Sequence, residues 1–235
     1  TSPSGANVLC DGGGNSCTAV NANIKIDDNT VGLRKYDIAV ISDCENADMF
    51  RIVNMPKDVS DDKITLAHSN SNNSSNNLSK TYDEDAMVMT FEALAYYVKD
   101  TGRKNSHGES IFALYMFDST YHASGSATVV GQEQELVEGV EQLQIAYGQK
   151  LSDGNIRFVP ADDGNLNWGE VEAIRFSVLV SGAEPVLQSD DSKTYKLSGT
   201  DVKPEGATSP ETTHPGDKRL RQVFSSTLFL RNLSE

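Results

Sequence analysis

The side chains that could carry out covalent or metal chemistry are few, and they are scattered along the sequence. Four histidines occur, His68, His107, His122 and His214, each in a polar, turn-like setting. No two of them have the spacing of metal ligands, and none stands next to a suitable nucleophile. The motifs GxSxG, HExxH, the P-loop and GxGxxG before a helix are absent. We therefore expect no enzymatic activity, no cofactor and no metal.

Acidic residues dominate the charge and leave two further kinds of chemistry to consider. Glu135, Glu138 and Glu141 recur every three residues. A glycosidase needs two carboxylates that face one cleft. A short lead-in helix would instead spread these three glutamates over a solvated surface, and we favour this second interpretation. The segment 162–167 is rich in Asp and Asn and suggests a calcium loop, but it lacks the EF-hand spacing. Ordinary β-turn chemistry is therefore the favoured interpretation there.

The three cysteines, Cys10, Cys17 and Cys44, all lie in the first fifth of the chain. An exported protein with three cysteines is expected to form one disulfide and to keep one thiol. Cys44 follows a predicted strand, where the geometry is fixed, so it is expected to be bridged, with either Cys10 or Cys17 as its partner. A zinc site is the competing interpretation, and it is disfavoured because CxxC spacing is missing and no histidine is near.

The charge balance excludes some classes of partner. The net charge is −14, whereas proteins that bind nucleic acids concentrate lysine and arginine to neutralise phosphates. The densest basic cluster, Lys218, Arg219 and Arg221, is interpreted as the solvated start of a strand. No apolar run approaches the roughly 18–20 residues that span a bilayer, and no signal peptide is evident. Nucleic acid is therefore not an expected partner.

Alternation of apolar and polar residues predicts a mainly β chain. The clearest pattern places Ile174, Phe176, Val178 and Val180 on one strand face. The segment 85–99 fits either a helix or a strand, and its Tyr-Tyr-Val run and the turn that follows favour a strand that pairs with residues 111–117. Other expected strands are Asn21–Ile26, Tyr36–Ser42, Met49–Val53, the run around Leu143, Ile145 and Tyr147, and Leu220–Leu230, where Phe224, Leu228 and Leu230 share a face.

Several connections between these strands have their own expected roles. The stretch ELVEGVE, residues 135–141, suits one turn of helix or an irregular lead-in, with Gly139 allowing a tight bend and Val140 packing inward. Trp168 is expected to anchor one end of the sheet at the core edge. The polar stretches near 58–80 and 184–217 are expected to be mobile loops within a single domain that spans residues 1–235.

Three motifs occur in a fixed order: ELVEGVE…LQ.AYG, then W..V.AIR.S.LV, then RLR.VFS.T..LRN. Together they resemble the PilW-type minor pilins of bacterial type IV pili. The resemblance covers Tyr36–Ile52, Ala86–Tyr115 and Glu135–Asn232. The residues that carry the motifs, each with a structural or an interface role, are Glu135, Leu136, Val137, Glu138, Gly139, Val140, Tyr147, Trp168, Arg219, Arg221, Phe224, Arg231 and Asn232.

The resemblance implies an α+β pilin-like head, made of antiparallel sheets with short helical segments and long loops. In such proteins the head is attached to an apolar N-terminal helix, which these residues do not include and which would anchor the full-length protein in the inner membrane. The implied function is non-enzymatic assembly with other minor pilins to prime pilus growth, first in the periplasm and then at the extracellular pilus tip. The implied partners are other minor pilins, the major pilin and a tip adhesin.

Two other functions compete with this interpretation. The J-type minor pseudopilins of type II secretion are similar to PilW-type proteins, so a role in secretion is the nearest alternative. A stand-alone adhesive or carbohydrate-binding β module would present a row of exposed aromatic residues. Tyr96, Tyr97, Tyr115 and Tyr121 are the candidates for such a row.

Overall fold

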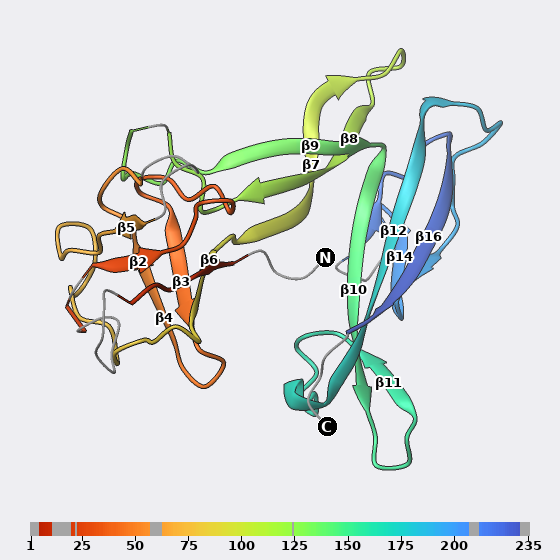
Figure 1. Cartoon of the computed structure of the whole chain (residues 1–235). Coiled ribbons are helices and arrows are strands. Elements are labelled where there is room, and N and C mark those ends of the chain that lie inside the picture. Colours follow the sequence, from red (N-terminus) through yellow and green to blue (C-terminus); the bar gives the residue numbers. More distant parts are fainter. Residues whose placement is uncertain are drawn as a thin grey trace. The chain divides into compact units, whose positions relative to one another are not determined.

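The computed structural model describes residues 5–10, 20–21, 23–56, 63–123, 125–206 and 212–230. These residues form two compact units (Figure 1). The first unit comprises residues 1–95 and 117–133, and the second comprises 96–116 and 134–235. The chain leaves the first unit along β7 (Leu94–Lys104), returns along β8 (Ser110–Asp118), and enters the second unit again along β9 (Gln132–Glu138). These three strands form one sheet with the order β7-β8-β9.

The first unit is built from short strands in two small sheets. One sheet has the order β1-β6-β3-β4 and the other pairs β2 with β5. The strand pairings within these sheets are antiparallel. The strands are β1 (Ala6–Asn7), β2 (Ile24–Ile26), β3 (Ile38–Ser42), β4 (Ala47–Arg51), β5 (Ile64–Leu66) and β6 (Met87–Thr90).

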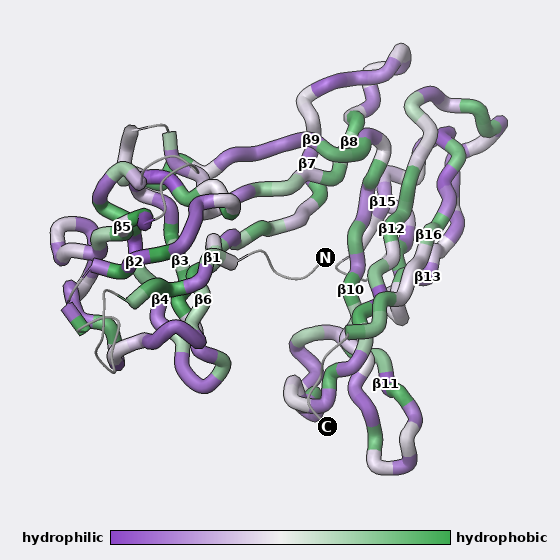
Figure 2. The backbone as a smooth tube through the Cα atoms, viewed as in Figure 1, coloured by the Kyte–Doolittle hydropathy of each residue, from purple (hydrophilic) through white to green (hydrophobic). Residues whose placement is uncertain are grey.

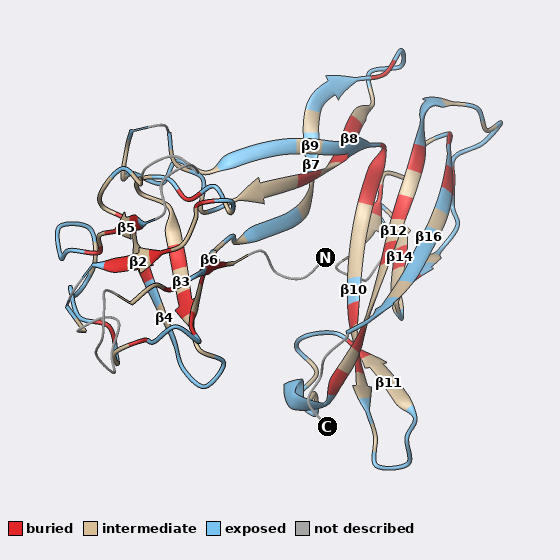
Figure 3. Ribbon diagram, viewed as in Figure 1, coloured by how far each residue is buried: buried red, intermediate tan, exposed pale blue. Residues whose placement is uncertain are grey.

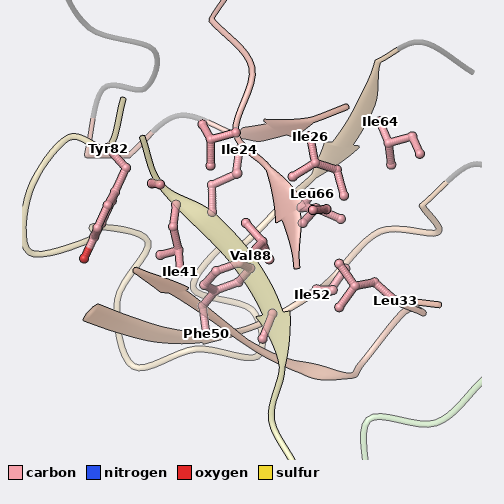
Figure 4. Packing of buried hydrophobic residues seen from close by; sticks show 14 of the residues in the cluster. Ile24, Ile26, Leu33, Ile41, Phe50, Ile52, Ile64, Leu66, Tyr82 and Val88 are labelled. Carbon is pink, nitrogen blue, oxygen red and sulfur yellow. The ribbon is translucent and has the colours of Figure 1, made fainter. Parts of the chain in front are cut away.

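The two small sheets enclose a single apolar core (Figure 4). Alternate residues of the short strands point inward, as the pleat of a strand requires. Ile24 and Ile26 of β2 and Ile64 and Leu66 of β5 are all fully buried. Tyr82 joins them from the loop before β6, and its hydroxyl donates a hydrogen bond of 2.9 Å to Asp48. This core holds the described part of the first unit together without an α-helix.

Part of the polar run near 58–80 is tied to this core. Residues 57–62 lie outside the described part of the chain, but Leu78 is buried against the apolar cluster. The Asn73 side chain accepts a hydrogen bond from the Arg51 backbone N–H and donates one to the Arg51 carbonyl. A single asparagine therefore extends the edge of β4 as another strand would.

The second unit is centred on a four-stranded antiparallel sheet with the order β11-β10-β12-β16. Its strands are β10 (Val140–Lys150), β11 (Ile156–Val159), β12 (Val171–Pro185) and β16 (Arg219–Phe229). The pairing register places Ile145 opposite Phe176, and Phe176 opposite Ser226. Side chains in one such row lie on the same sheet face.

The two faces of this sheet differ in how they are covered. On one face, Leu179 of β12 and Val223 of β16 pack against Leu197 and Val202. These last two belong to β13 (Tyr195–Leu197) and β14 (Thr200–Pro204), which form a small sheet with β15 (Thr213–His214). The long connection 184–217 therefore contains strands and supplies the cover for one face, which its polar composition does not indicate.

The other face carries the more apolar side chains but remains open within the second unit. Figure 2 shows hydrophobic stretches along β12, and Figure 3 shows exposed residues along much of β16. Ile145, Phe224 and Leu228 are 40, 53 and 57% exposed. We call this surface the open face, and its members are Leu143, Ile145, Tyr147, Ile174, Phe176, Val178, Phe224 and Leu228.

The predicted fold class, mainly β with antiparallel sheets, is confirmed. The single strand expected over residues 85–99 is instead two strands: β6 pairs in the first unit with β1 and β3, and only β7 lies next to β8. The other expected strands are present with ends shifted by a few residues. The described residues contain one short 3-10 helix, Trp168–Glu170, and no α-helix. The segment ELVEGVE forms neither the helical turn nor the irregular lead-in that the sequence suggested, because Glu135 to Glu138 belong to β9, which pairs with β8. No helix among the described residues is long and apolar enough to cross a membrane.

Candidate functional site

Two of the three sequence motifs meet in a buried cluster of charges in the second unit. Arg221 of β16 forms a two-pronged ion pair with Glu141 of β10, with distances of 2.7 Å from Nε to Oε2 and 3.1 Å from Nη2 to Oε1. The Nη2 atom of Arg221 also donates to Asp217 at 2.7 Å. The side chains of Arg221 and Glu141 are 0 and 1% exposed. Two segments 80 residues apart are thereby joined.

Arg219 strengthens the same cluster from the next position on that side of β16. Its Nη2 atom lies 2.7 Å from Asp217 Oδ2 and 3.2 Å from Glu141 Oε1. Its Nη1 atom donates a hydrogen bond of 3.0 Å to the carbonyl of Ser110 in β8. We call Glu141, Asp191, Asp217, Arg219 and Arg221 the buried ion cluster.

The expectation that Arg219 and Arg221 begin a solvated strand is wrong. The two arginines alternate with exposed Leu220, so they point to the covered face of the sheet. Their charges are matched there by three carboxylates: Glu141 of β10, Asp191 of the connection 184–217, and Asp217 just before β16. Buried charges occur in proteins when they are paired in this way. Glu141 is likewise not part of a solvated acidic surface.

The connection 184–217 is linked to the buried ion cluster through Asp191. Burial by itself raises the pKa of Asp191, but hydrogen bonds from the Tyr195 hydroxyl and the Lys193 backbone N–H outweigh it, so the pKa is lowered. The Tyr195 hydroxyl donates at 2.7 Å. The pKa of Asp217 is also lowered, because hydrogen bonds from Arg219 and Arg221 outweigh the effect of burial.

These lowered pKa values predict the pH dependence of the second unit. A carboxylate whose pKa is lower in the folded state contributes stability above its unfolded pKa, and this stability is lost as pH falls through the folded pKa. The unfolded pKa of aspartate is about 3.9. We expect a melting temperature that changes little between about pH 7 and pH 5 and falls below about pH 4. Thermal unfolding followed by near-UV circular dichroism measures this, and a melting temperature unchanged down to about pH 2 contradicts it.

Gly139 makes the bend at the junction of β9 and β10, as the sequence predicts. Its φ is +84°, in the left-handed region that favours glycine. Its N–H donates to the Phe112 carbonyl at 2.8 Å, and its carbonyl accepts from the Ser181 N–H at 2.8 Å. A Cβ atom at this position would lie 2.6 Å from the Ser181 carbonyl oxygen. Val140 follows it and is buried, so the motif directs the chain from one sheet into the next.

We expect Gly139→Ala to destabilise the second unit by about 1–3 kcal/mol, because the left-handed backbone is strained for alanine and the Ser181 carbonyl must move. Urea unfolding measures the change. Gly154→Ala is the matched control, since Gly154 has the same φ of +84° but a Cβ added there would meet no atom within 4 Å. Equal losses for both variants would show that the contact with Ser181 has no effect.

Glu135 and Glu138, the first two acids of the motif, have a different environment from Glu141. Both lie on β9 and form ion pairs with Arg103 of β7, at 2.5 and 2.8 Å. Tyr115 of β8 donates a hydrogen bond of 3.2 Å to Glu135. These groups are partly exposed and tie the three strands of one sheet together across its face. Leu136 and Val137, between them, are 40 and 49% exposed.

Trp168 and Tyr147 lie together at one end of the open face. Their rings meet edge to face with centroids 4.7 Å apart. Trp168 is 57% exposed, so it is not the core-edge residue that the sequence suggests. Its ring instead adds aromatic surface next to the open face. Phe224, Leu228 and Leu230 are exposed, although the prediction that they follow one strand face is consistent with the register of β16.

The remaining predicted site residues are placed as follows. Cys44 is a free, exposed thiol, so the prediction that it is bridged is wrong; it occupies a hairpin turn with φ of +69°. Cys10 takes part in a disulfide. Cys17, Arg231 and Asn232 lie outside the described residues. Among the described residues, no three His, Cys, Asp or Glu side chains are grouped so as to hold a metal ion.

These features define a class of protein. A β domain with a rigid ionic interior and a broad open apolar face is suited to binding other protein surfaces. The sequence profile of the family "Type IV Pilus-assembly protein W" matches residues 95–232, and the chain belongs to this family. The buried ion cluster and the open face both lie within the matched region. No curated protein and no solved structure matches the chain.

Proposed function

We propose that the chain is the head of a minor pilin, which assembles with other minor pilins to prime type IV pilus growth and then sits at the pilus tip. Membership of the pilus-assembly family supports a role in building the pilus. The observation that carries the finer proposal is the open face. It is the more apolar face of the main sheet, and within the second unit its members are only half-buried or exposed.

An exposed face of this kind is unfavourable unless another apolar surface covers it. Burying one large apolar side chain completely contributes about 1.5–3 kcal/mol, so covering the several members of the open face supplies ample driving force for assembly. A sheet face that stays in contact with solvent usually carries polar residues, whereas the open face carries mainly apolar ones. We propose that an apolar surface on the head of a neighbouring minor pilin covers this face in the assembled state.

The buried ion cluster has a supporting role in this proposal. It ties β16 and the connection 184–217 to β10, and so holds the strands that display the open face in a fixed register. The same rigidity would let the head present loops and sheet edges to neighbouring subunits without chemical change.

We propose that both compact units act together as one head, which is periplasmic before assembly and extracellular afterwards. The major pilin and a tip adhesin are further proposed partners.

The proposal is tested by a pull-down of the purified chain against purified heads of the other minor pilins from the same pilus system. We expect micromolar or tighter binding to at least one of them. Heads of type II secretion pseudopilins serve as the comparison set. Binding only to that set would support a role in secretion instead, and binding to neither set would contradict assembly through this head.

A further inference from the structure

The first unit contains a cavity of about 200 Å³ that the pilus-assembly family does not explain. Three segments of this unit line it: residues 31–38, 90–92 and 118–122. The family profile begins at residue 95, so the first two segments lie outside the matched region. Most of the lining groups are polar or charged, which distinguishes this cavity from a gap in an apolar core.

The wall of the cavity is held rigid by a histidine–carboxylate pair. His122 Nε2 lies 3.0 Å from Asp37 Oδ1, and the two side chains are 7 and 14% exposed. The other carboxylate oxygen of Asp37 accepts a hydrogen bond of 2.7 Å from the Arg34 backbone N–H. The Tyr36 ring packs edge to face against the His122 ring, with centroids 6.2 Å apart. Segments 85 residues apart are thus fixed around one space.

Two carboxylates at the cavity retain unused hydrogen-bonding capacity. Asp118 Oδ1 accepts hydrogen bonds from the Thr120 N–H and hydroxyl and from the Tyr121 N–H, at 2.9, 2.7 and 3.1 Å. Its Oδ2 atom makes no hydrogen bond with a described residue. The carboxylate of Glu92 also forms neither a hydrogen bond nor an ion pair with the described residues. Asp118 is therefore oriented by its own turn while one of its oxygens stays available.

A second cavity, of about 230 Å³, is lined by some of the same side chains. Arg34, Tyr121 and His122 line both cavities, and Lys35 and Met55 line only the second. The Nε atom of Arg34 lies 3.5 Å from Asp37 Oδ2, and the side chain is 75% exposed, so its two terminal nitrogens can still donate hydrogen bonds to a ligand. Tyr121 is 37% exposed and presents part of its ring at the surface. An aromatic ring shared by two small cavities is suited to a ligand with flat apolar faces.

This combination of groups selects a class of ligand. Free carboxylates accept hydrogen bonds from hydroxyl or ammonium groups, a guanidinium donates them, and an aromatic ring packs against C–H surface. Carboxylates outnumber arginine around the first cavity, which disfavours anionic ligands. Its volume is below the roughly 300–1,000 Å³ of sites for drug-sized ligands, which limits the occupant to about one ring. We propose that the first unit binds a neutral or amino sugar ring in the first cavity, beside Tyr121.

Nuclear magnetic resonance titration of the whole ¹⁵N-labelled chain tests this proposal. The probes are the methyl glycosides of glucose, galactose and mannose, together with N-acetylglucosamine and glucosamine. Glucuronate and N-acetylneuraminate are the anionic comparison ligands. We expect saturable shifts of the Gly32 and Thr120 amides with at least one neutral or amino sugar, and weaker or no shifts with the anionic ones.

Two variants separate a built site from general surface binding. Glu92→Ala removes a charged acceptor that has no partner among the described residues, so the fold is retained while sugar affinity falls by about 10-fold or more. Tyr121→Ala is expected to weaken binding similarly through loss of the ring surface. Glu84→Ala, an exposed acid of the same unit outside both cavities, is the matched control and should leave the affinity unchanged.

The proposal is overturned if none of the neutral or amino sugars gives saturable shifts at these amides, or if the anionic sugars bind more tightly. It is also overturned if Glu84→Ala weakens binding as much as Glu92→Ala does. Its failure is distinct from failure of the pilus-assembly proposal, because the cavity lies in the first unit, whereas the finer assembly proposal rests on the open face of the second unit. We expect the Glu92→Ala and Tyr121→Ala variants to keep binding other minor pilins.

Discussion

Replacing Arg221 by methionine is expected to destabilise the second unit by about 3–5 kcal/mol, the usual effect of removing one partner from a buried ion pair. The substitution keeps most of the side-chain volume, so the loss is electrostatic rather than a packing defect. It leaves the Glu141 carboxylate, which is 1% exposed, without its two-pronged partner. Asp191 and Asp217 lose a shared counter-charge at the same time. Chemical denaturation monitored by tryptophan fluorescence measures the change, since Trp168 is the one tryptophan in the chain.

Two further variants test the cause of that loss. Arg103→Met removes an arginine that also pairs with two glutamates, but at a site where its side chain is 46% exposed. We expect a much smaller change in the free energy of unfolding there, because solvent screens exposed pairs. The double variant Glu141→Gln with Arg221→Met should lose less than the sum of the two single changes, because the uncompensated buried charge is gone. Additive losses would show that the two residues do not act as a pair.

Phe224→Asp is expected to abolish binding to other pilus components while leaving the isolated chain folded. Phe224 is 53% exposed on the outer strand of the sheet, so the change should alter the free energy of unfolding by only about 0.5 kcal/mol. In an assembly that covers the open face, the same change buries an unpaired charge. A central interface residue then contributes at least about 2 kcal/mol, which is roughly 30-fold or more in affinity.

The matched control for this prediction is Val186→Asp. Val186 is 68% exposed in the same unit but lies in the connection after β12 and is not one of the residues that form the open face. It introduces the same charge at an apolar surface position and should leave binding unchanged. Isothermal titration calorimetry with the partner identified by pull-down measures both variants. Equal losses for the two would mean that added charge, rather than the open face, governs binding.

The strands themselves could be predicted from the sequence, because period-2 alternation depends only on neighbouring residues. Ile174, Phe176 and Val178 identify β12 in this way, and the resemblance to the pilus-assembly family rests on motifs in the same strands. Alternation also shows which residues share a face. It does not show which face is covered, and here the more apolar face is the open one. An apolar sheet face is usually assumed to be buried within its own domain. This assumption fails for a face that a partner protein covers.

The buried ion cluster could not be predicted from the sequence for a different reason. Arg221 and Glu141 are 80 residues apart, and their pairing depends on the register between β10, β12 and β16. Locally, RLR has the composition of a solvated strand start. Without knowledge of the strand register, the sequence does not show that Glu141 pairs with these arginines. The alternation of Arg219 and Arg221 around Leu220 is the one available signal, since period 2 allows arginines to face inward together.

The segment ELVEGVE shows the limit of short patterns. Apolar residues at spacings of one, three and four fit a helical turn as well as a strand interrupted by a bend. The decision comes from long-range pairing with β8 and from Gly139, whose positive φ turns the chain into β10. The His122–Asp37 pair of the first unit is similar, because its two members are 85 residues apart and neither carries a motif.

The most direct test of assembly through the open face is thiol labelling at position 224. In a Cys44→Ser background, which removes the exposed native thiol, Phe224→Cys places a reactive thiol on the open face. Maleimide labelling is then compared between the isolated chain and the same variant in minor-pilin complexes purified from pilus-producing cells. Val186→Cys in the same background reports on general accessibility. Rapid labelling of position 224 in the isolated chain and strong protection in the complex, with position 186 labelled in both, is the predicted result. Equal labelling of position 224 in both states would contradict the proposal that assembly covers the open face.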